Sequence, residues 1–158
     1  MANDYINLTR DGRDKICRDL ENLKGPKRRE IAVALAEARA HGDLSENSEY
    51  DAAKEAQAMN EKRIAHLEEV LMRARIIDDD KIAKDEALIG ATVKVKDNNS
   101  GEEYNYVLVS EEEADFDEDR ISISSPVGKA LLGHRAGDIV EVRVPAGTLE
   151  YTILEISR

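Results

Sequence analysis

The chain has 158 residues, enough for one domain of ordinary size or two small ones. Aromatic residues make up only 4% and the net charge is −11, which argues against a base-stacking site and against wrapping a nucleic-acid backbone. The sequence shows no long apolar run and no basic segment followed by an apolar leader, which predicts a cytoplasmic protein without a transmembrane helix. The single Cys17 excludes an intramolecular disulfide.

Charge and composition change together near Asp78. Residues 1–77 carry 14 Lys and Arg against 15 Asp and Glu, whereas residues 78–158 carry 9 against 19. The first part is rich in Ala, Glu, Arg and Leu, and the second has Val, Ile, Ser and Gly in short alternating runs. We therefore predict an α+β chain with a helical domain over 1–77, a mainly β domain over 78–158 and an acidic joint at 78–80.

The first apolar pattern has helical spacing and contains a proline. Thr9 is a candidate N-cap, and Gly25-Pro26 predicts a kink or a break because proline lacks a backbone donor and clashes with the preceding turn. The residues of the pattern are Ile16, Leu20 and Leu23 before the proline, and Ile31, Ala34, Leu35 and Ala38 after it.

The second apolar pattern is a heptad seam. Its residues, spaced alternately three and four apart, are Tyr50, Ala53, Gln57, Asn60, Ile64, Leu67, Leu71 and Ala74. With a short linker before it, the seam predicts an antiparallel coiled-coil hairpin over 28–76, about 40 Å long, with 41–48 at its free end. The alternative is a bundle or a dimerising coil; the alanines of 32–40 favour close packing within one chain, so we expect a monomer.

The free end is acidic. Between Arg39 and Lys54 there are four acids and no Lys or Arg, and Asp43 and Glu46 share a face in any helical turn. Such a pair suits Mg²⁺, which takes one or two protein carboxylates and completes its shell with water and phosphate. The alternative is a capping turn, with Asp43 or Ser45 as N-cap and Glu46 or Glu49 near the positive helix end.

The second half predicts an antiparallel sheet with one short helix. Strands are expected at 92–96, 104–110, 120–124, 138–144 and 151–157, with turns at 97–101 and 145–147. Ser125 and Pro126 fit the N-cap and first position of a helix that Gly133 ends. The side chains expected to pack beneath the sheet are Val127, Ala130, Leu131 and Leu132.

Other clusters have simpler interpretations. The acidic run 111–119 holds seven acids, but Arg120 stands where a calcium loop needs Gly, so we expect a solvated loop. The three histidines are too scattered for a zinc site, and Cys17 fits a small core side chain. The basic cluster of 24–29 lies far from the free end, and a polymerase or RNA contact there is only a hypothesis.

The chain resembles the Gre family of bacterial transcript cleavage factors over nearly its whole length. The resemblance rests on HGDLSENSEY at 41–50, AAKE at 52–55 and SPVGKALLG at 125–133. It implies an N-terminal antiparallel coiled coil and a C-terminal domain similar to the FKBP fold. It also implies a transcription elongation factor that enters the secondary channel of bacterial RNA polymerase and stimulates that enzyme's cleavage of backtracked nascent RNA.

The resemblance also implies roles for individual residues. Asp43 and Glu46 become the catalytic acids, which support the second Mg²⁺ and the attacking water only within the polymerase complex. The factor is then an accessory protein, not an enzyme, and binds no cofactor alone. The residues implied in supporting the tip are Gly42, Leu44, Asn47 and Tyr50, although the seam favours packing for Tyr50. Those implied in contacts with polymerase or RNA are Arg39, Lys54, Ser124, Ser125 and Pro126.

Two other functions stay open at this point. A Gre-like factor that occupies the channel and inhibits polymerase shares the fold, but the paired acids favour cleavage. A prolyl isomerase is suggested by the FKBP-like fold alone, yet the C-terminal part has one Phe and no Trp to line a proline pocket.

Overall fold

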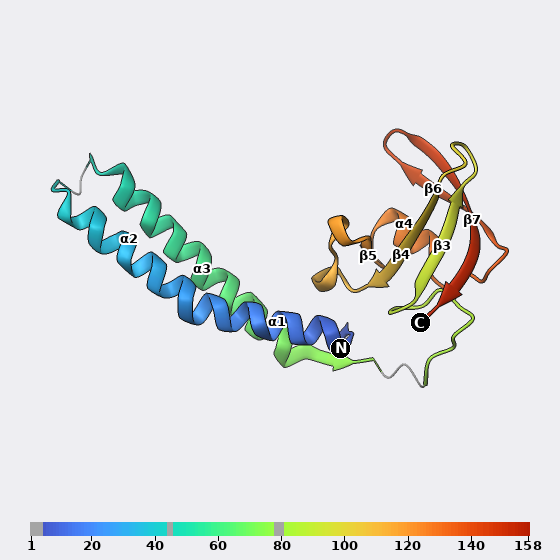
Figure 1. Cartoon of the computed structure of the whole chain (residues 1–158), viewed down its shortest axis with the longest axis horizontal. Helices are drawn as coiled ribbons and strands as arrows, with labels where there is room; N and C mark the ends of the chain where they lie inside the picture. The colour runs from blue at the N-terminus through green and yellow to red at the C-terminus, as the bar shows by residue number, and fades with distance from the viewer. Residues whose placement is uncertain (1–4, 44–45, 78–80) are drawn as a thin grey trace. The chain divides into compact units, whose positions relative to one another are not determined.

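The computed structural model describes residues 5–43, 46–77 and 81–158, and it divides into two compact units. One unit is Asp11–Ala74, and the other joins Tyr5–Arg10 to Arg75–Arg158 (Figure 1). The sequence division near Asp78 placed residues 5–10 with the helical part, whereas the structure groups them with the β unit. The predicted acidic joint at 78–80 lies outside the described residues.

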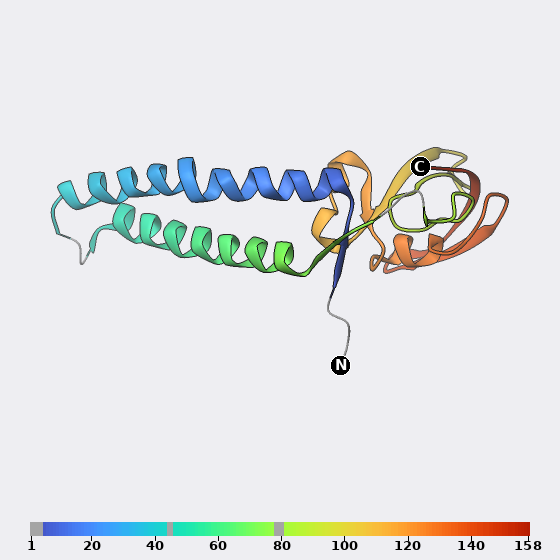
Figure 2. The ribbon, with the colours of Figure 1, turned by 90° about the horizontal axis from the view of Figure 1, so that it is seen from below.

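The helical unit is a hairpin of two long rods that lie side by side (Figures 1 and 2). The first rod runs through α1 (Arg10–Asn22), the π-helical turn η1 (Leu23–Lys27) and α2 (Arg28–Ala40), and the second is α3 (Ser48–Arg73). Of the predicted kink or break at Pro26, the break is wrong, because the helical rod continues through this residue. A π turn has a wider backbone than an α-helix, and it accommodates the proline without interrupting the rod.

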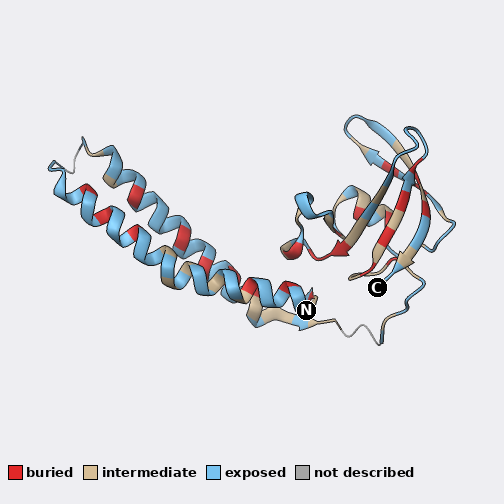
Figure 3. Ribbon diagram, in the orientation of Figure 1, coloured by how far each residue is buried: buried red, intermediate tan, exposed pale blue. Residues whose placement is uncertain are grey.

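Burial follows the predicted seam, with local exceptions (Figure 3). In α3 the buried residues are Ala53, Asn60, Ile64, Leu67 and Val70. They face Ile31, Leu35 and Ala38 and the preceding turns of the first rod, which confirms a coiled-coil hairpin. Gln57 and Ala34 are exposed, so these two seam assignments are wrong, and Val70 takes the buried place expected of Leu71.

The β unit contains a five-stranded sheet in the order β5-β4-β3-β7-β6. The strands are β3 (Thr92–Asp97), β4 (Glu103–Val109), β5 (Arg120–Ser122), β6 (Ile139–Val144) and β7 (Gly147–Ser157). All five predicted strands are present, but β4 pairs with β5 in parallel, which corrects the expectation of a purely antiparallel sheet. A separate ribbon of β1 (Ile6–Leu8) and β2 (Ala74–Ile76) was not predicted.

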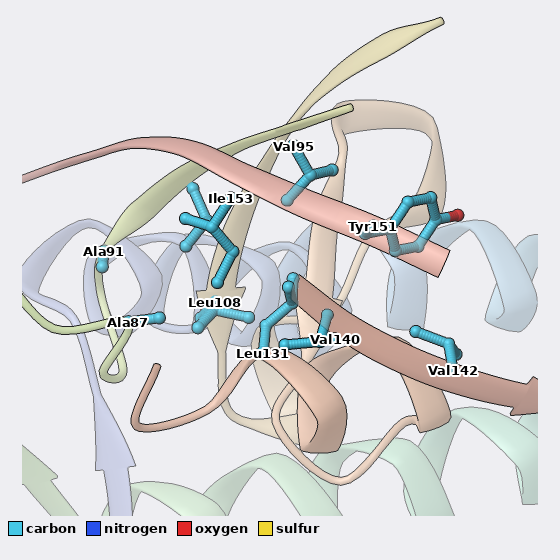
Figure 4. Close-up of a cluster of buried hydrophobic side chains, with 10 residues drawn as sticks. Ala87, Ala91, Val95, Leu108, Leu131, Val140, Val142, Tyr151 and Ile153 are labelled. Carbon is cyan, nitrogen blue, oxygen red and sulfur yellow. The ribbon is translucent and has the colours of Figure 1, made fainter. Parts of the chain in front are cut away.

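The core of this unit lies between the sheet and helix α4 (Pro126–Leu131), as Figure 4 shows. Leu131 is fully buried against strand residues such as Val140 and Ile153, and Val127 and Ala130 are partly buried there. The predicted burial of Leu132 is wrong, because it follows the end of α4 and is 39% exposed. Within the described residues, no helix has the length and apolarity needed to cross a membrane.

Candidate functional site

The far end of the hairpin is shaped first by the end of α2. The backbone N–H of His41 donates to the Ala38 carbonyl at 3.2 Å, and that of Gly42 donates to the Arg39 carbonyl at 3.4 Å. Gly42 has a φ of +108°, a region that L side chains rarely adopt, so glycine suits this position. The chain therefore leaves the helix at Gly42 and presents Asp43 immediately beyond it.

The start of α3 is defined by Asn47. Its Oδ1 accepts a hydrogen bond from the backbone N–H of Tyr50 at 3.1 Å, the contact expected of an N-cap. The capping interpretation that gave this position to Asp43 is therefore wrong, and its other candidate, Ser45, lies outside the described residues. Glu49 and Asp51 occupy the first turn of α3, where negative charge is favourable.

Two acids lie between these helix ends, and both are exposed. Asp43 follows Gly42, and Glu46 precedes the N-cap residue Asn47. The implied tip residue Leu44 lies outside the described residues. Carboxylate oxygens are the ligands that Mg²⁺ prefers, and exposure leaves room for water and phosphate in its shell. The donor type therefore fits a Mg²⁺ ion shared with a partner. Across the described part of the chain, no three His, Cys, Asp or Glu side chains form a metal-binding group.

The remaining implied tip residues lie on the helices that flank the acids. Tyr50 packs against the cluster of Ile31, Leu35 and Ala53, as the seam predicted. The Arg39 guanidinium carbon lies 5.9 Å from the centre of the Tyr50 ring, within the range of a cation–π contact. Lys54 reaches Gln57 of its own helix, at 3.5 Å between Nζ and Oε1. Arg39 and Lys54 are exposed and lie one on each rod.

Two residues of the predicted basic cluster, Lys24 and Arg28, form ion pairs within the hairpin. Arg28 makes a two-pronged contact with Glu61, with both N–O distances at 2.9 Å, and Lys24 Nζ lies 3.1 Å from the Glu68 carboxylate. The hydrogen bond from Arg28 lowers the pKa of the Glu61 carboxyl. Exposed pairs of this kind contribute little individually, but these two link the first rod to α3.

A second group of implied contact residues lies at the start of α4. Ser125 is the N-cap: its Oγ accepts from the Gly128 N–H at 3.1 Å and donates to the Ser122 carbonyl at 2.6 Å. The capping prediction for Ser125 is confirmed. A Cβ added to Gly128 would lie 1.9 Å from the Ser122 carbonyl oxygen, so the backbone packs closely at this turn. Ser124 and Pro126 are exposed on it.

One structurally important residue was missed in the acidic run. Glu113 is only 8% exposed, its carboxylate lies 2.9 Å from the Arg120 guanidinium, and it accepts from the backbone N–H and hydroxyl of Thr9. The prediction of a solvated loop is therefore wrong at this residue. In the sequence it lies among similar acids, and its partners Arg120 and Thr9 lie seven and 104 residues away, so local spacing gave no signal.

Comparisons with known proteins cover both units. Residues 6–76 match the family described as "Transcription elongation factor, N-terminal", and residues 82–158 match "Transcription elongation factor, GreA/GreB, C-term". The chain therefore belongs to the GreA/GreB family of transcription elongation factors, whose members stimulate transcript cleavage by RNA polymerase. This membership confirms the predicted resemblance and function.

Individual sequence relatives agree with this assignment. The chain is 49% identical over 150 residues to the transcription elongation factor GreA of Flavobacterium johnsoniae, with 95% of each chain covered. It is 51% identical to that of Thermoanaerobacter pseudethanolicus, with 96% of each covered. Among solved structures, the GreA factor homolog 1 protein of Thermus thermophilus is 33% identical, with 98% of this chain and 99% of that chain covered and a TM-score of 0.45. The names of the two sequence relatives favour an elongation factor over the inhibitory alternative.

Proposed function

We propose that this chain acts through Asp43 and Glu46, which it carries into the active site of RNA polymerase during cleavage of backtracked RNA. The observation that supports this most is the placement of two exposed acids between α2 and the N-cap of α3. The 26 residues of α3 span about 39 Å, so the hairpin has the length to reach a buried site.

The proposed chemistry needs only what two carboxylates supply. A bound Mg²⁺ would polarise a phosphoryl oxygen and make a coordinated water easier to deprotonate. Asp43 and Glu46 contribute negatively charged oxygen ligands that favour occupancy of a weakly held cation. Either carboxylate also accepts a hydrogen bond from the attacking water and thereby orients it toward the phosphate.

The separate roles of this chain and of its polymerase partner follow from this arrangement. We propose that the chain is an accessory factor and not an enzyme, acting as a cytoplasmic monomer on bacterial RNA polymerase and the backtracked nascent RNA. The turn at 122–126 is the proposed docking surface, because Ser124 and Pro126 are exposed on it while hydrogen bonds to Ser122 hold the turn together. Arg39 and Lys54, on opposite rods, are the proposed contacts to RNA phosphates or to polymerase.

The test uses a stalled, backtracked elongation complex with Mg²⁺ and the full-length protein. Asp43→Asn and Glu46→Gln remove the charges while keeping similar shapes, and each is expected to lower cleavage of the transcript 3′ end by at least about 100-fold. Asp51→Asn is the matched control, since Asp51 is an exposed acid in the first turn of α3. Affinity for polymerase, measured by competition with labelled wild type, is expected to stay unchanged.

Two outcomes oppose the proposal in different ways. Full cleavage by either tip variant excludes a role for that carboxylate. If the wild type leaves backtracked RNA intact but slows nucleotide addition on complexes that have not backtracked, the chain is the inhibitory factor instead.

A further inference from the structure

One polar side chain is buried in the seam of the hairpin. Asn60 is 6% exposed and occupies a heptad position of α3 between Ala53 and Ile64. Its Nδ2 donates a hydrogen bond of 3.1 Å to the backbone carbonyl of Leu23 on the first rod. A buried amide that finds a partner contributes specificity, whereas the same amide without one is strongly unfavourable.

The partner carbonyl lies in the irregular part of the first rod. Leu23 opens the π-helical turn Leu23–Lys27, in which the backbone hydrogen bonds depart from the regular i→i−4 pattern. In regular α-helix on either side, carbonyl groups are already bonded to N–H groups four residues ahead. Asn60 therefore has a distinctive partner at one level of the first rod, and sliding α3 by a turn would remove it.

The hydrogen bond from Asn47 Nδ2 to the Ala38 carbonyl is a second directional contact between the rods, at the far end of the hairpin. The ion pairs and apolar contacts agree with the same register without specifying it as strictly. Arg28–Glu61 and Lys24–Glu68 link the rods near the same level, but all four side chains are about half exposed. Long exposed side chains adjust to small displacements, and such pairs contribute little. Apolar contacts along the seam also tolerate a shift to the next ridge, because they have no directional requirement.

We propose that Asn60 is a positioning residue, which fixes the register of α3 against the first rod through the Leu23 carbonyl and thereby places Asp43 and Glu46. The inference rests on the proposed function of those two acids. Any slip between the rods must be absorbed by residues 41–47, which connect them, so the segment that carries both acids is the part that a slip distorts. A buried Asn in a heptad seam specifies register in this way, at some expense of stability.

The experiment compares Asn60→Leu and Asn60→Ala with Gln57→Leu in the full-length chain. Gln57 is the matched control, because it is the other polar residue of the predicted heptad pattern but is exposed, and its Oε1 accepts from Lys54 of the same helix. Register is measured independently of activity by electron-spin distance between labels at Glu37→Cys and Lys62→Cys, which are exposed and lie on opposite rods. Cys17→Ser removes the native thiol from this background.

The expected result separates positioning from stability. Asn60→Leu is expected to melt at or above the wild-type temperature, because an apolar residue replaces a buried amide. Its distance distribution should gain a population displaced by about one helical turn, ~5.4 Å. The maximal cleavage rate at saturating factor should fall about tenfold or more, with the half-saturating concentration unchanged. Asn60→Ala should show the same displaced population, and Gln57→Leu should match wild type in all four measurements.

Three outcomes would overturn the inference. One is a single wild-type distance with a full maximal rate in both Asn60 variants. The second is a fall in melting temperature and rate together with the distance unchanged, which assigns Asn60 a purely structural role. The third is a shift of equal size in Gln57→Leu. If wild type itself fails to stimulate cleavage, the proposed function is wrong, but the distance measurement still decides whether Asn60 sets the register.

Discussion

Asn47 bridges the two rods of the hairpin: its Nδ2 donates a 2.7 Å hydrogen bond to the backbone carbonyl of Ala38, nine residues earlier. The other atom of the same amide, Oδ1, caps α3 by accepting from the Tyr50 N–H. Ala38 is buried and is the residue whose carbonyl also accepts from His41, at the end of α2. A single side chain therefore closes the base of the segment that carries Asp43 and Glu46.

Replacing Asn47 is expected to loosen that closure. Asn47→Ala removes both the cap and the bridge, and we expect a loss of about 1–2 kcal/mol in the free energy of unfolding. Asn47→Asp keeps a good capping acceptor but loses the donor to Ala38, so it should be less destabilised. Urea unfolding and the maximal cleavage rate are the measurements. Equal, wild-type behaviour of both variants would show that the bridge has no consequence.

The buried Glu113 gives a second prediction, about stability alone. Glu113→Ala leaves the Arg120 guanidinium and two Thr9 donors without the carboxylate that holds them, and we expect a loss of about 3 kcal/mol. Glu111→Ala is the control, since Glu111 is exposed in the same short helix and should change stability by less than about 0.5 kcal/mol. Urea unfolding measures both; similar small effects would contradict a structural role for Glu113.

Gly128 tests the close packing of the turn that precedes α4. A Gly→Ala change within a helix ordinarily stabilises a protein, by about 0.4–1 kcal/mol. Here the new Cβ would meet the Ser122 carbonyl at 1.9 Å, so Gly128→Ala is expected to destabilise by about 1–3 kcal/mol or more. The neighbouring Lys129→Ala, on an exposed residue, should be nearly neutral. A loss of polymerase affinity in Gly128→Ala alone, measured by competition at a temperature where it is folded, would support docking through Ser124 and Pro126.

Asp138 gives a prediction about pH. Its Oδ2 accepts from the Arg135 backbone N–H at 2.9 Å and lies 3.1 Å from His134 Nδ1; the backbone bond first, and then the histidine, lower the pKa of this carboxyl. Because the folded pKa is below the unfolded value of about 3.9, the stabilisation is present above that value and is lost as pH falls through the folded pKa. Melting temperatures of wild type and Asp138→Asn should therefore differ at about pH 6 and converge at about pH 2. A constant difference across this range would contradict the assignment, and Asp117→Asn serves as an exposed control.

Features that depend on neighbouring residues were readable from the sequence. Ile64 and Leu67 are buried because the heptad places them on one face, and Ser125 caps α4 because the N–H donor to its hydroxyl, that of Gly128, lies three residues ahead. The acids at 43 and 46 were found in the same way, since charge and spacing are local properties. Leu44 and Ser45, which separate the two acids, lie outside the described residues, so the placement of the two carboxylates relative to each other stays a prediction.

Features that join distant residues could not be predicted in this way. The parallel pairing of β4 with β5 depends on Leu108 meeting Ile121, which no local alternation indicates. Glu113 is hydrogen-bonded to Thr9, 104 positions away, and Asn60 is hydrogen-bonded to Leu23, 37 positions away. Strand β1 has only three residues, too few for a periodic pattern to stand out.

The π-helical turn also determines the direction in which the apolar stripe of the first rod faces. Leu23 and Ile31, which belong to the first apolar pattern on either side of it, are eight residues apart, one more than a heptad. The wider turn takes up the additional residue, so that Leu35 and Ala38 still face α3. Without it, the apolar stripe beyond Pro26 would be rotated by about 100° away from its partner. The proline that was expected to interrupt the rod therefore lies where two helical stripes of different phase are brought into line.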